Sequence, residues 1–327
     1  MSLPAAAHQQ VTAGGELREV ADGVFAYIQE PGGWCVSNSG VLAGPDAVTL
    51  VDTAATEQRA RGLAAAVAQV VRRPVSTIVN THHHGDHLFG NAVFTPPATV
   101  IAHELARLEA ARSGPALRAA FPDVEWGTLP PALPTVTFTD RLSLFVGELR
   151  VELIHVGPAH TTNDVIVWIP DRRVLFTGDV VLSGATPFCL MGSVAGTLRA
   201  VRTLRDLDAA ILICGHGPPT GPAALDVTQA YLGRVLELAA DGLAAGLTPL
   251  ETALAAGPGP FADLLDPERL VANLHRAYAE LRPAGHPASP DAAPVGVAPA
   301  EVARIPSGPV FAEMVAYNGG RPLTCLA

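Results

Sequence analysis

The segment from Asn80 to Asn91, Asn-Thr-His-His-His-Gly-Asp-His-Leu-Phe-Gly-Asn, constrains this chain more than any other stretch of it. It places four side chains that can bind a metal within six residues, in an H-x-H-x-D-H pattern: His82, His84, Asp86 and His87. The short apolar run at residues 75–80 predicts a buried strand that ends at this motif. Side chains on the loop after a strand can converge on one point. Imidazole and carboxylate donors without thiolate suit zinc, so we expect a zinc site here.

Three further residues of the same kind follow downstream. His160, Asp179 and His216 each come directly after a run that predicts a strand, and each lies beside Gly or Pro. The three predicted strands are residues 149–156, 173–176 and 209–214. We therefore expect all three side chains to lie on loops at strand ends, where they could complete a metal site.

This set of residues resembles that of the metallo-β-lactamase superfamily. The resemblance implies an α/β fold, the αββα sandwich. It implies that one metal is held by His82, His84 and His160, a second by Asp86, His87 and His216, and that Asp179 bridges the two. Asp52, at the end of the run Val-Thr-Leu-Val-Asp, matches the acidic position behind the ligands, and we expect it to orient a ligating imidazole.

Not every histidine is expected to bind metal. His83 lies between two candidate ligands and is expected to point away from the site. A structural or solvent-facing role is also the better interpretation of the histidines without a local partner or inside a predicted element: His8, His103, His155, His275 and His286. The aspartate at 179, where one class of β-lactamase has cysteine, favours the glyoxalase-type thioesterases and hydrolases within the superfamily.

The composition limits the classes of protein to which this chain can belong. The chain has 327 residues, of which 49% are hydrophobic, which is enough for one large domain with an appended region. Its net charge is −10 and it contains no lysine, which argues against a nucleic-acid partner. Residues 1–10 lack the pattern of a signal peptide, and no apolar run is long enough for a membrane span, so we expect a cytoplasmic protein. The four cysteines show no C-x-x-C spacing and are expected to be reduced.

The periodicity of apolar residues along the sequence predicts that the chain has two parts. Residues 1–227 are expected to form the catalytic domain, in which strands and helices occur in two successive halves separated by a proline-rich stretch at 129–134. Residues 228–327 are expected to form a helical C-terminal extension, with a Pro/Ala-rich linker at 283–309 and a final amphipathic helix at 310–317. The sequence leaves open whether this final helix docks on its own chain or on a partner subunit, and a homodimer is possible.

Four segments go beyond the general superfamily pattern: residues 32–38, 184–196, 270–278 and 315–327. They resemble the zinc-dependent cyclases of bacterial aromatic (type II) polyketide pathways, the second-ring cyclases of actinorhodin-type assembly. The resemblance implies a bifunctional enzyme. Its substrate would be a polyketide bound to an acyl carrier protein. The enzyme would close a ring by intramolecular aldol condensation with loss of water, and would then hydrolyse the thioester.

Two zinc ions about 3.5–4 Å apart can activate water and polarise a carbonyl, which suits both steps. We expect the base and nucleophile to be a metal-bound hydroxide held by Asp179 and Asp86. Four side chains are candidates for an apolar substrate pocket, with plain packing as the alternative: Trp34, Phe188, Leu190 and Met191. The alternative functions are a glyoxalase-II-like thioester hydrolase, a lactonase or β-lactamase, and a non-catalytic binding module.

Overall fold

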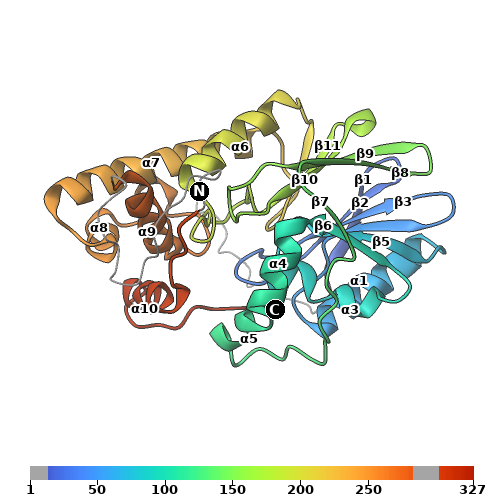
Figure 1. Cartoon of the computed structure of the whole chain (residues 1–327), viewed down its shortest axis with the longest axis horizontal. Coiled ribbons are helices and arrows are strands. Elements are labelled where there is room, and N and C mark those ends of the chain that lie inside the picture. The colour runs from blue at the N-terminus through green and yellow to red at the C-terminus, as the bar shows by residue number, and fades with distance from the viewer. Residues whose placement is uncertain (1–13, 283–301) are drawn as a thin grey trace, which may run out of the picture.

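The computed structural model describes residues 14–282 and 302–327, and its centre is a pair of β-sheets packed face to face (Figure 1). Of the strands in these residues, seven form a first sheet in chain order and five form a second sheet in the order β12-β11-β10-β9-β8. The strands of the first sheet are β1 Glu16–Ala21, β2 Val24–Ile28, β3 Ser39–Ala43, β4 Val48–Val51, β5 Val75–Val79, β6 Thr99–His103 and β7 Val136–Phe138. Those of the second are β8 Arg141–Val146, β9 Leu149–His155, β10 Val165–Ile169, β11 Val174–Gly178 and β12 Ile211–Cys214.

Helices cover the outer face of each sheet, which confirms the predicted αββα sandwich. On the first sheet, α1 (Glu57–Val70) packs Leu63 and Val67 against strand residues such as Leu50 and Ile78. On the second, α6 (Val194–Asp206) buries Ala200, Val201 and Leu204. Shorter helices complete this part: α2 Gly85–Leu88, α3 Asn91–Phe94, α4 Glu104–Ser113 and α5 Ala116–Ala120, with a 3₁₀ turn at Pro170–Arg172. Figure 1 shows α6 above the two sheets and α1 and α3 below them.

The strand directions explain where the candidate ligands lie. β4 and β5 are parallel neighbours, so Asp52 and the histidine motif leave the first sheet at the same edge. In the second sheet β9 and β11 both run antiparallel to β10, and β12 runs parallel to β11. The loops that carry His160, Asp179 and His216 therefore leave the second sheet at one edge as well.

The C-terminal part is helical, as predicted, and packs beside the sandwich at the left of Figure 1. It contains α7 Ala223–Ala245, α8 Pro249–Ala256, a 3₁₀ turn at Gly259–Phe261, α9 Arg269–Leu281 and α10 Ser307–Tyr317. Helices α7, α9 and α10 share one apolar cluster with the loops around Trp34 and Phe188, so the helical part and the sandwich have a common core.

Two details differ from the expected division of the chain. The boundary expected at 227/228 falls inside α7, which runs without interruption from the sandwich into the helical part. Of the linker expected at 283–309, residues 283–301 lie outside the described part of the chain, and α10 already begins at Ser307. Among the helices of residues 14–282 and 302–327, none combines the length and the hydrophobicity needed to cross a membrane.

Candidate metal centre

The loop after β5 is held in shape by amide side chains at its two ends. Asn80 donates to the carbonyl of His87 at 3.1 Å, and Asn91 donates to the side-chain oxygen of Asn80 at 2.8 Å. Thr53, in the loop after β4, donates to the same His87 carbonyl at 3.1 Å. These buried contacts satisfy backbone groups that the short helix α2 leaves without helical partners. They fix the direction in which the histidines project. These roles were not predicted from the sequence, although the two asparagines at the ends of the motif could have suggested that amide side chains hold the loop.

The loops bring all seven predicted ligands together. Their donor atoms form three groups, within each of which the atoms lie within 4.8 Å of one another: His82/His84/His160, His82/His87/Asp179 and Asp86/His87/His216. The first and third groups are the two sets expected for the two metals.

Asp179 lies between these two groups. Its Oδ1 is 3.2 Å from His87 Nε2, and its Oδ2 is 3.3 Å from His216 Nε2 and 3.5 Å from His160 Nε2. Each carboxylate oxygen thus faces the second group, and Oδ2 also faces the first. A glycine at 215 makes this position possible, because a Cβ atom there would lie 1.8 Å from Asp179 Oδ1. The geometry agrees with a bridging role, which remains a prediction.

Unpartnered polar atoms indicate that these residues fit a metal. His82 Nε2, His87 Nε2 and Asp179 Oδ1 are buried and make no hydrogen bond of acceptable geometry, although the last two lie 3.2 Å apart. A buried polar atom normally has one, so each unpaired atom calls for an explanation, and a bound cation is one. Donor atoms of imidazole and carboxylate, with no cysteine among them, form a set that zinc accepts.

Hydrogen bonds on the far side of each ring direct the free nitrogens inward. His216 Nδ1 donates to the carbonyl of Gly33 at 3.1 Å, and His160 Nδ1 donates to the carbonyl of Phe188. His82 Nδ1 lies 3.0 Å from Thr81 Oγ1. A neutral ring that carries its proton on Nδ1 presents a lone pair on Nε2, which is the atom that faces the other ligands. These backbone acceptors could not be identified from the sequence.

Asp52 occupies the expected position behind the ligands. It adopts φ +57°, and its carboxylate accepts three hydrogen bonds: from Thr81 N at 2.7 Å, from Thr81 Oγ1 at 2.6 Å and from His87 Nδ1 at 2.9 Å. The left-handed backbone conformation is one that Asp and Asn adopt more readily than other non-glycine residues. The third bond holds the ring of His87, and the role of Asp52 in orienting a metal ligand remains a prediction.

The histidines of the site differ in their electrostatics. Burial holds the pKa of His82 and His84 well below the usual range, so both rings are neutral at pH 7. Burial also lowers the affinity of His87 and His216 for a proton, but the carboxylates beside them outweigh it. Asp179 and Asp86 raise the pKa of His87 well above its ordinary value, and raise that of His216 to about 9. A cation would replace those protons.

The structure places the four candidate pocket residues in two environments. Trp34, Phe188 and Leu190 belong to the apolar cluster shared with the C-terminal helices. Trp34 packs edge-on against Phe188 at 5.4 Å, donates to Glu268 at 2.7 Å and is covered by the guanidinium of Arg269 at 4.1 Å. Met191 contacts a ligand through its side chain, with its sulfur 3.2 Å from His84 Nε2, whereas Phe188 contacts His160 through its carbonyl. Contact of any of them with substrate remains a prediction.

The other histidines lie outside the three ligand groups. His83 turns to Asn163, with 3.0 Å between its Nδ1 and the amide nitrogen. His103 and His155 stack on each other at 3.9 Å. His275, which has no candidate partner nearby in the sequence, lies with its Nε2 2.8 Å from Glu313 Oε2 on α10, in agreement with the structural role expected of it. His8 and His286 lie outside the described residues.

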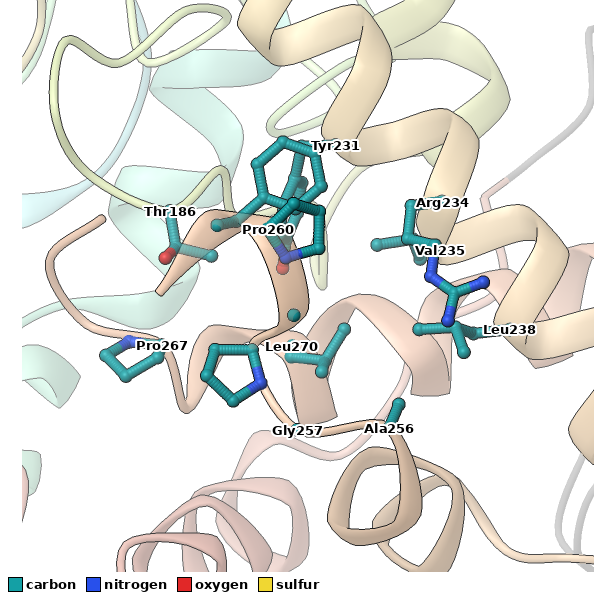
Figure 2. A pocket seen from close by; sticks show the side chains of 13 residues that line it. Thr186, Tyr231, Arg234, Val235, Leu238, Ala256, Gly257, Pro260, Pro267 and Leu270 are labelled. Carbon is teal, nitrogen blue, oxygen red and sulfur yellow. The ribbon is translucent and has the colours of Figure 1, made fainter. Parts of the chain in front are cut away.

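Figure 2 shows a pocket in the C-terminal part. Its lining comes from α7, from the start of α9, from the loop between α8 and α9 and from Thr186 of the loop after Asp179, and includes Tyr231, Val235 and Leu270. Arg234 contributes a single guanidinium. None of the seven ligands and none of the four candidate pocket residues lines it. We therefore place the chemistry at the metal centre.

Known proteins share parts of this chain. The α subunit of a 2,4-dinitroanisole O-demethylase from a Nocardioides species is 33% identical over 176 residues, which are 53% of this chain and 46% of that protein. A hydroxyacylglutathione hydrolase from Rhodospirillum rubrum is 29% identical over 152 residues, which are 46% of this chain and 52% of that protein. The matched region thus spans about half the length of these two relatives.

The fold has solved counterparts. A metallo-β-lactamase from Pontibacter korlensis superposes with a TM-score of 0.57 at 21% identity, over 67% of this chain and 99% of that one. At this identity the likeness shows a shared fold. The family profile of the metallo-β-lactamase superfamily matches residues 32–216, which is more than half of the chain and contains all seven ligands. The chain therefore belongs to the metallo-β-lactamase superfamily, whose members are metal-dependent hydrolases.

Proposed function

We propose that this protein is a dizinc polyketide cyclase and thioesterase. Its substrate would be an aromatic polyketide intermediate bound to an acyl carrier protein. The enzyme would close a ring by intramolecular aldol condensation and dehydration, and would then hydrolyse the thioester. The observation that carries the hydrolytic half is the position of Asp179 between two complete ligand groups.

Two zinc ions bound there would lower the pKa of water and polarise a carbonyl, which favours both enolate formation and thioester hydrolysis. The chain's own residues would set the geometry. Asp179 would hold both metal positions at a fixed separation, and Asp52 would keep the proton of His87 on the nitrogen that faces away from the site. The burial of the ligands would exclude bulk water, which strengthens the electrostatic interactions inside the site.

The cyclase half is supported by the four segments that go beyond the superfamily pattern, because they contact one another beside the metal centre. Trp34 of the first packs edge-on against Phe188 of the second and donates to Glu268, two residues before the third. In the third segment, Asn273 accepts from the amide of Cys189, and Arg276 donates to the carbonyl of Leu190, both in the second. The fourth packs through Cys325 on the apolar cluster that contains Cys35 of the first. Four segments that converge on one place indicate a common task, and substrate binding is the one we propose.

A thioester hydrolase of the glyoxalase II type is the second candidate, favoured by the 29% identity to a hydroxyacylglutathione hydrolase. Such an enzyme would need cationic side chains near the metals to hold the glutathione carboxylates. Between residues 228 and 265 this chain has one basic side chain, Arg234, and it lines the separate pocket of Figure 2.

Mass spectrometry of a carrier protein loaded with a partly cyclised polyketide tests the proposal. The zinc-loaded protein is expected to remove one water from the bound chain and then to release free carrier and an acid. A His160→Ala variant, which removes a ligand of the first metal, is the matched control and should leave the carrier loaded. A zinc-loaded protein that leaves the carrier unchanged but hydrolyses S-lactoylglutathione would refute the proposal in favour of the second candidate.

A further inference from the structure

The last part of the chain returns to the metal-binding body. Helix α10 packs on α8 and α9 and buries Val310 and Met314 in the shared apolar cluster. Just before it, the carbonyl of Ala303 accepts from Arg276 at 2.9 Å. Figure 1 shows the chain leaving α10 and running back toward the foot of α4, between the helical part and the sandwich. In this structure the segment therefore docks on its own chain.

The residues that follow α10 lie along the body in an irregular, extended path. From residue 323 to 327, every second side chain is partly buried: Leu323, Cys325 and Ala327. Thr324 and Leu326, between them, are exposed. Alternation with a period of two is what an extended segment shows when one side faces a surface. The inward side packs on the cluster that contains Trp34 and Phe188, next to the metal centre.

A buried arginine anchors this C-terminal segment (residues 321–327). Arg59, on α1, is 4% exposed. Its guanidinium donates to the carbonyl of Leu326 and, at 2.8 Å, to the side-chain oxygen of Gln29. Gln29 donates to the carbonyl of Ser37, and the hydroxyl of Ser37 donates to the carbonyl of Asp86 at 2.6 Å. A chain of buried hydrogen bonds thus connects the segment to the backbone of a predicted metal ligand.

A pair of thiols forms a second contact. Cys325 packs on the apolar cluster that contains Cys35, and the two thiols are close enough to influence each other electrostatically, as the carboxylate of Asp86 influences both. Gly32, three residues before Cys35, packs so tightly on the loop of His216 that a Cβ atom there would lie 2.3 Å from the nitrogen of Gly217. Cys325 therefore contacts the loop that itself contacts the metal centre.

The metal centre is nearly closed to solvent. Six of its seven ligands are buried, with Asp86 and Asp179 the most exposed of these at 8%, and His84 is half-buried. Movement of a neighbouring part would widen the access of a bulky thioester to such a site. The strands and α1 are fixed by the sheets and their cores, whereas the C-terminal segment has no regular structure and is held by side-chain packing and by Arg59.

We propose that residues 321–327 form a movable wall of the substrate entrance, anchored by the positioning residue Arg59, and that this wall limits which acyl groups reach the metal centre. The part of this inference that concerns acyl selection rests on the proposed thioesterase function. The part that concerns access to the metals does not.

Metal access is tested by the rate at which zinc is captured from the loaded full-length protein by 4-(2-pyridylazo)resorcinol. Arg59→Met removes both anchoring donors, and Arg61→Met, on the same helix but paired with Glu57 at the surface, is the matched control. A second variant ends at Pro322. Loss of charged hydrogen bonds should speed capture about tenfold in R59M and in the shortened chain, with R61M unchanged. Equal capture rates in all four proteins would overturn the proposal.

Oxidation of the two thiols should have the opposite effect on zinc capture to loss of the Arg59 anchor. The azo oxidant diamide takes up one hydrogen from each thiol and becomes the hydrazine, while Cys35 and Cys325 form a disulfide that holds the wall shut. Capture is expected to slow, to recover with dithiothreitol and to be unaffected by diamide in Cys325→Ser. A disulfide that forms and leaves the capture rate unchanged would count against a moving wall.

The acyl-selection part is tested by comparing kcat/KM for a small acyl thioester and for a bulky aromatic one. The shortened chain should lose discrimination between them, mainly through KM for the bulky substrate. If the full chain hydrolyses both and the shortened chain keeps the same ratio, the wall does not select substrate. If the full chain hydrolyses neither, the proposed function fails, and the zinc-capture rates still decide whether the wall exists.

Discussion

Replacing Asp52 with asparagine should weaken one metal position without unfolding the protein. Asparagine tolerates the left-handed backbone at φ +57° and can still accept the hydrogen bond from Thr81 N. It lacks the second carboxylate oxygen, which accepts from Thr81 Oγ1 and from His87 Nδ1. An amide NH₂ in that position meets two donors, so His87 would have to shift its proton to Nε2, the nitrogen that faces Asp179.

The size of the effect follows from these contacts. One charge-assisted hydrogen bond contributes about 1.5–3 kcal/mol, and loss of a partner behind a metal ligand weakens metal binding about 10–100-fold. We expect Asp52→Asn to lower zinc affinity by about this factor at the position of His87. The assay is a competitive zinc titration of the metal-free protein against a chromophoric chelator. Asp22→Asn is the control, because Asp22 is an exposed carboxylate in a surface ion pair with Arg172.

Equal zinc titrations of the two variants would contradict this prediction. If Asp52→Asn and Asp22→Asn titrate alike, with both metal positions of the wild type retained, then the hydrogen bond from Asp52 does not set the ring of His87. Thermal unfolding of the metal-free proteins separates this result from a general loss of fold. The expected effect on zinc exceeds the effect on unfolding, because the asparagine keeps its backbone and one acceptor.

Three further predictions concern other parts of the molecule. Met314→Ala should destabilise the protein by about 2–5 kcal/mol in denaturant unfolding, because Met314 is fully buried where α10 docks; no change would place α10 off the body. Burial, aided by His103, lowers the pKa of His155 to about 4. As the pH falls, this imidazole is therefore protonated in the unfolded chain at a higher pH than in the folded protein. Stability should fall by about 1–2 kcal/mol, after allowance for partial exposure, as pH drops from about 6.5 to 4; this loss should be absent in His155→Gln. Since the pKa of His216 is raised to about 9, zinc should displace its proton at pH 7. Isothermal titration in buffers of different ionisation enthalpy should show that release, and zinc affinity should rise with pH up to about 9.

The sequence predicted the ligands because they are local features. Four of them lie in one motif and three follow apolar runs, so strand periodicity predicted their places at strand ends, and the resemblance to the superfamily implied how they would divide between two metals. The partners that shape the site are of another kind. Trp34 is hydrogen-bonded to Glu268, which is 234 residues away in the sequence. His275 is hydrogen-bonded to Glu313 because α10 packs on α9. Such pairs depend on how whole helices dock, and no local period encodes that.

The role of Asp52 could be predicted only in part from the sequence. Its position after an apolar run was visible, and so was its acidity, but its three hydrogen bonds depend on the parallel pairing of β4 and β5. The docking of the C-terminal segment was left open by the sequence for the same reason. An amphipathic helix shows that it needs a partner surface, and only the fold shows which surface that is.

The two sheets contribute unequally to the metal centre: the loop after β5 in the first sheet supplies four candidate ligands, and the second sheet supplies three. A cation held by both groups is a cross-link between two layers whose inner faces meet through apolar contact. Such a cross-link stabilises the folded state in proportion to the logarithm of free metal, by about 4 kcal/mol at a thousand times the dissociation constant. The lifetime of this protein in the cell would then depend on zinc supply, since metal-starved copies would open between the layers and be degraded first.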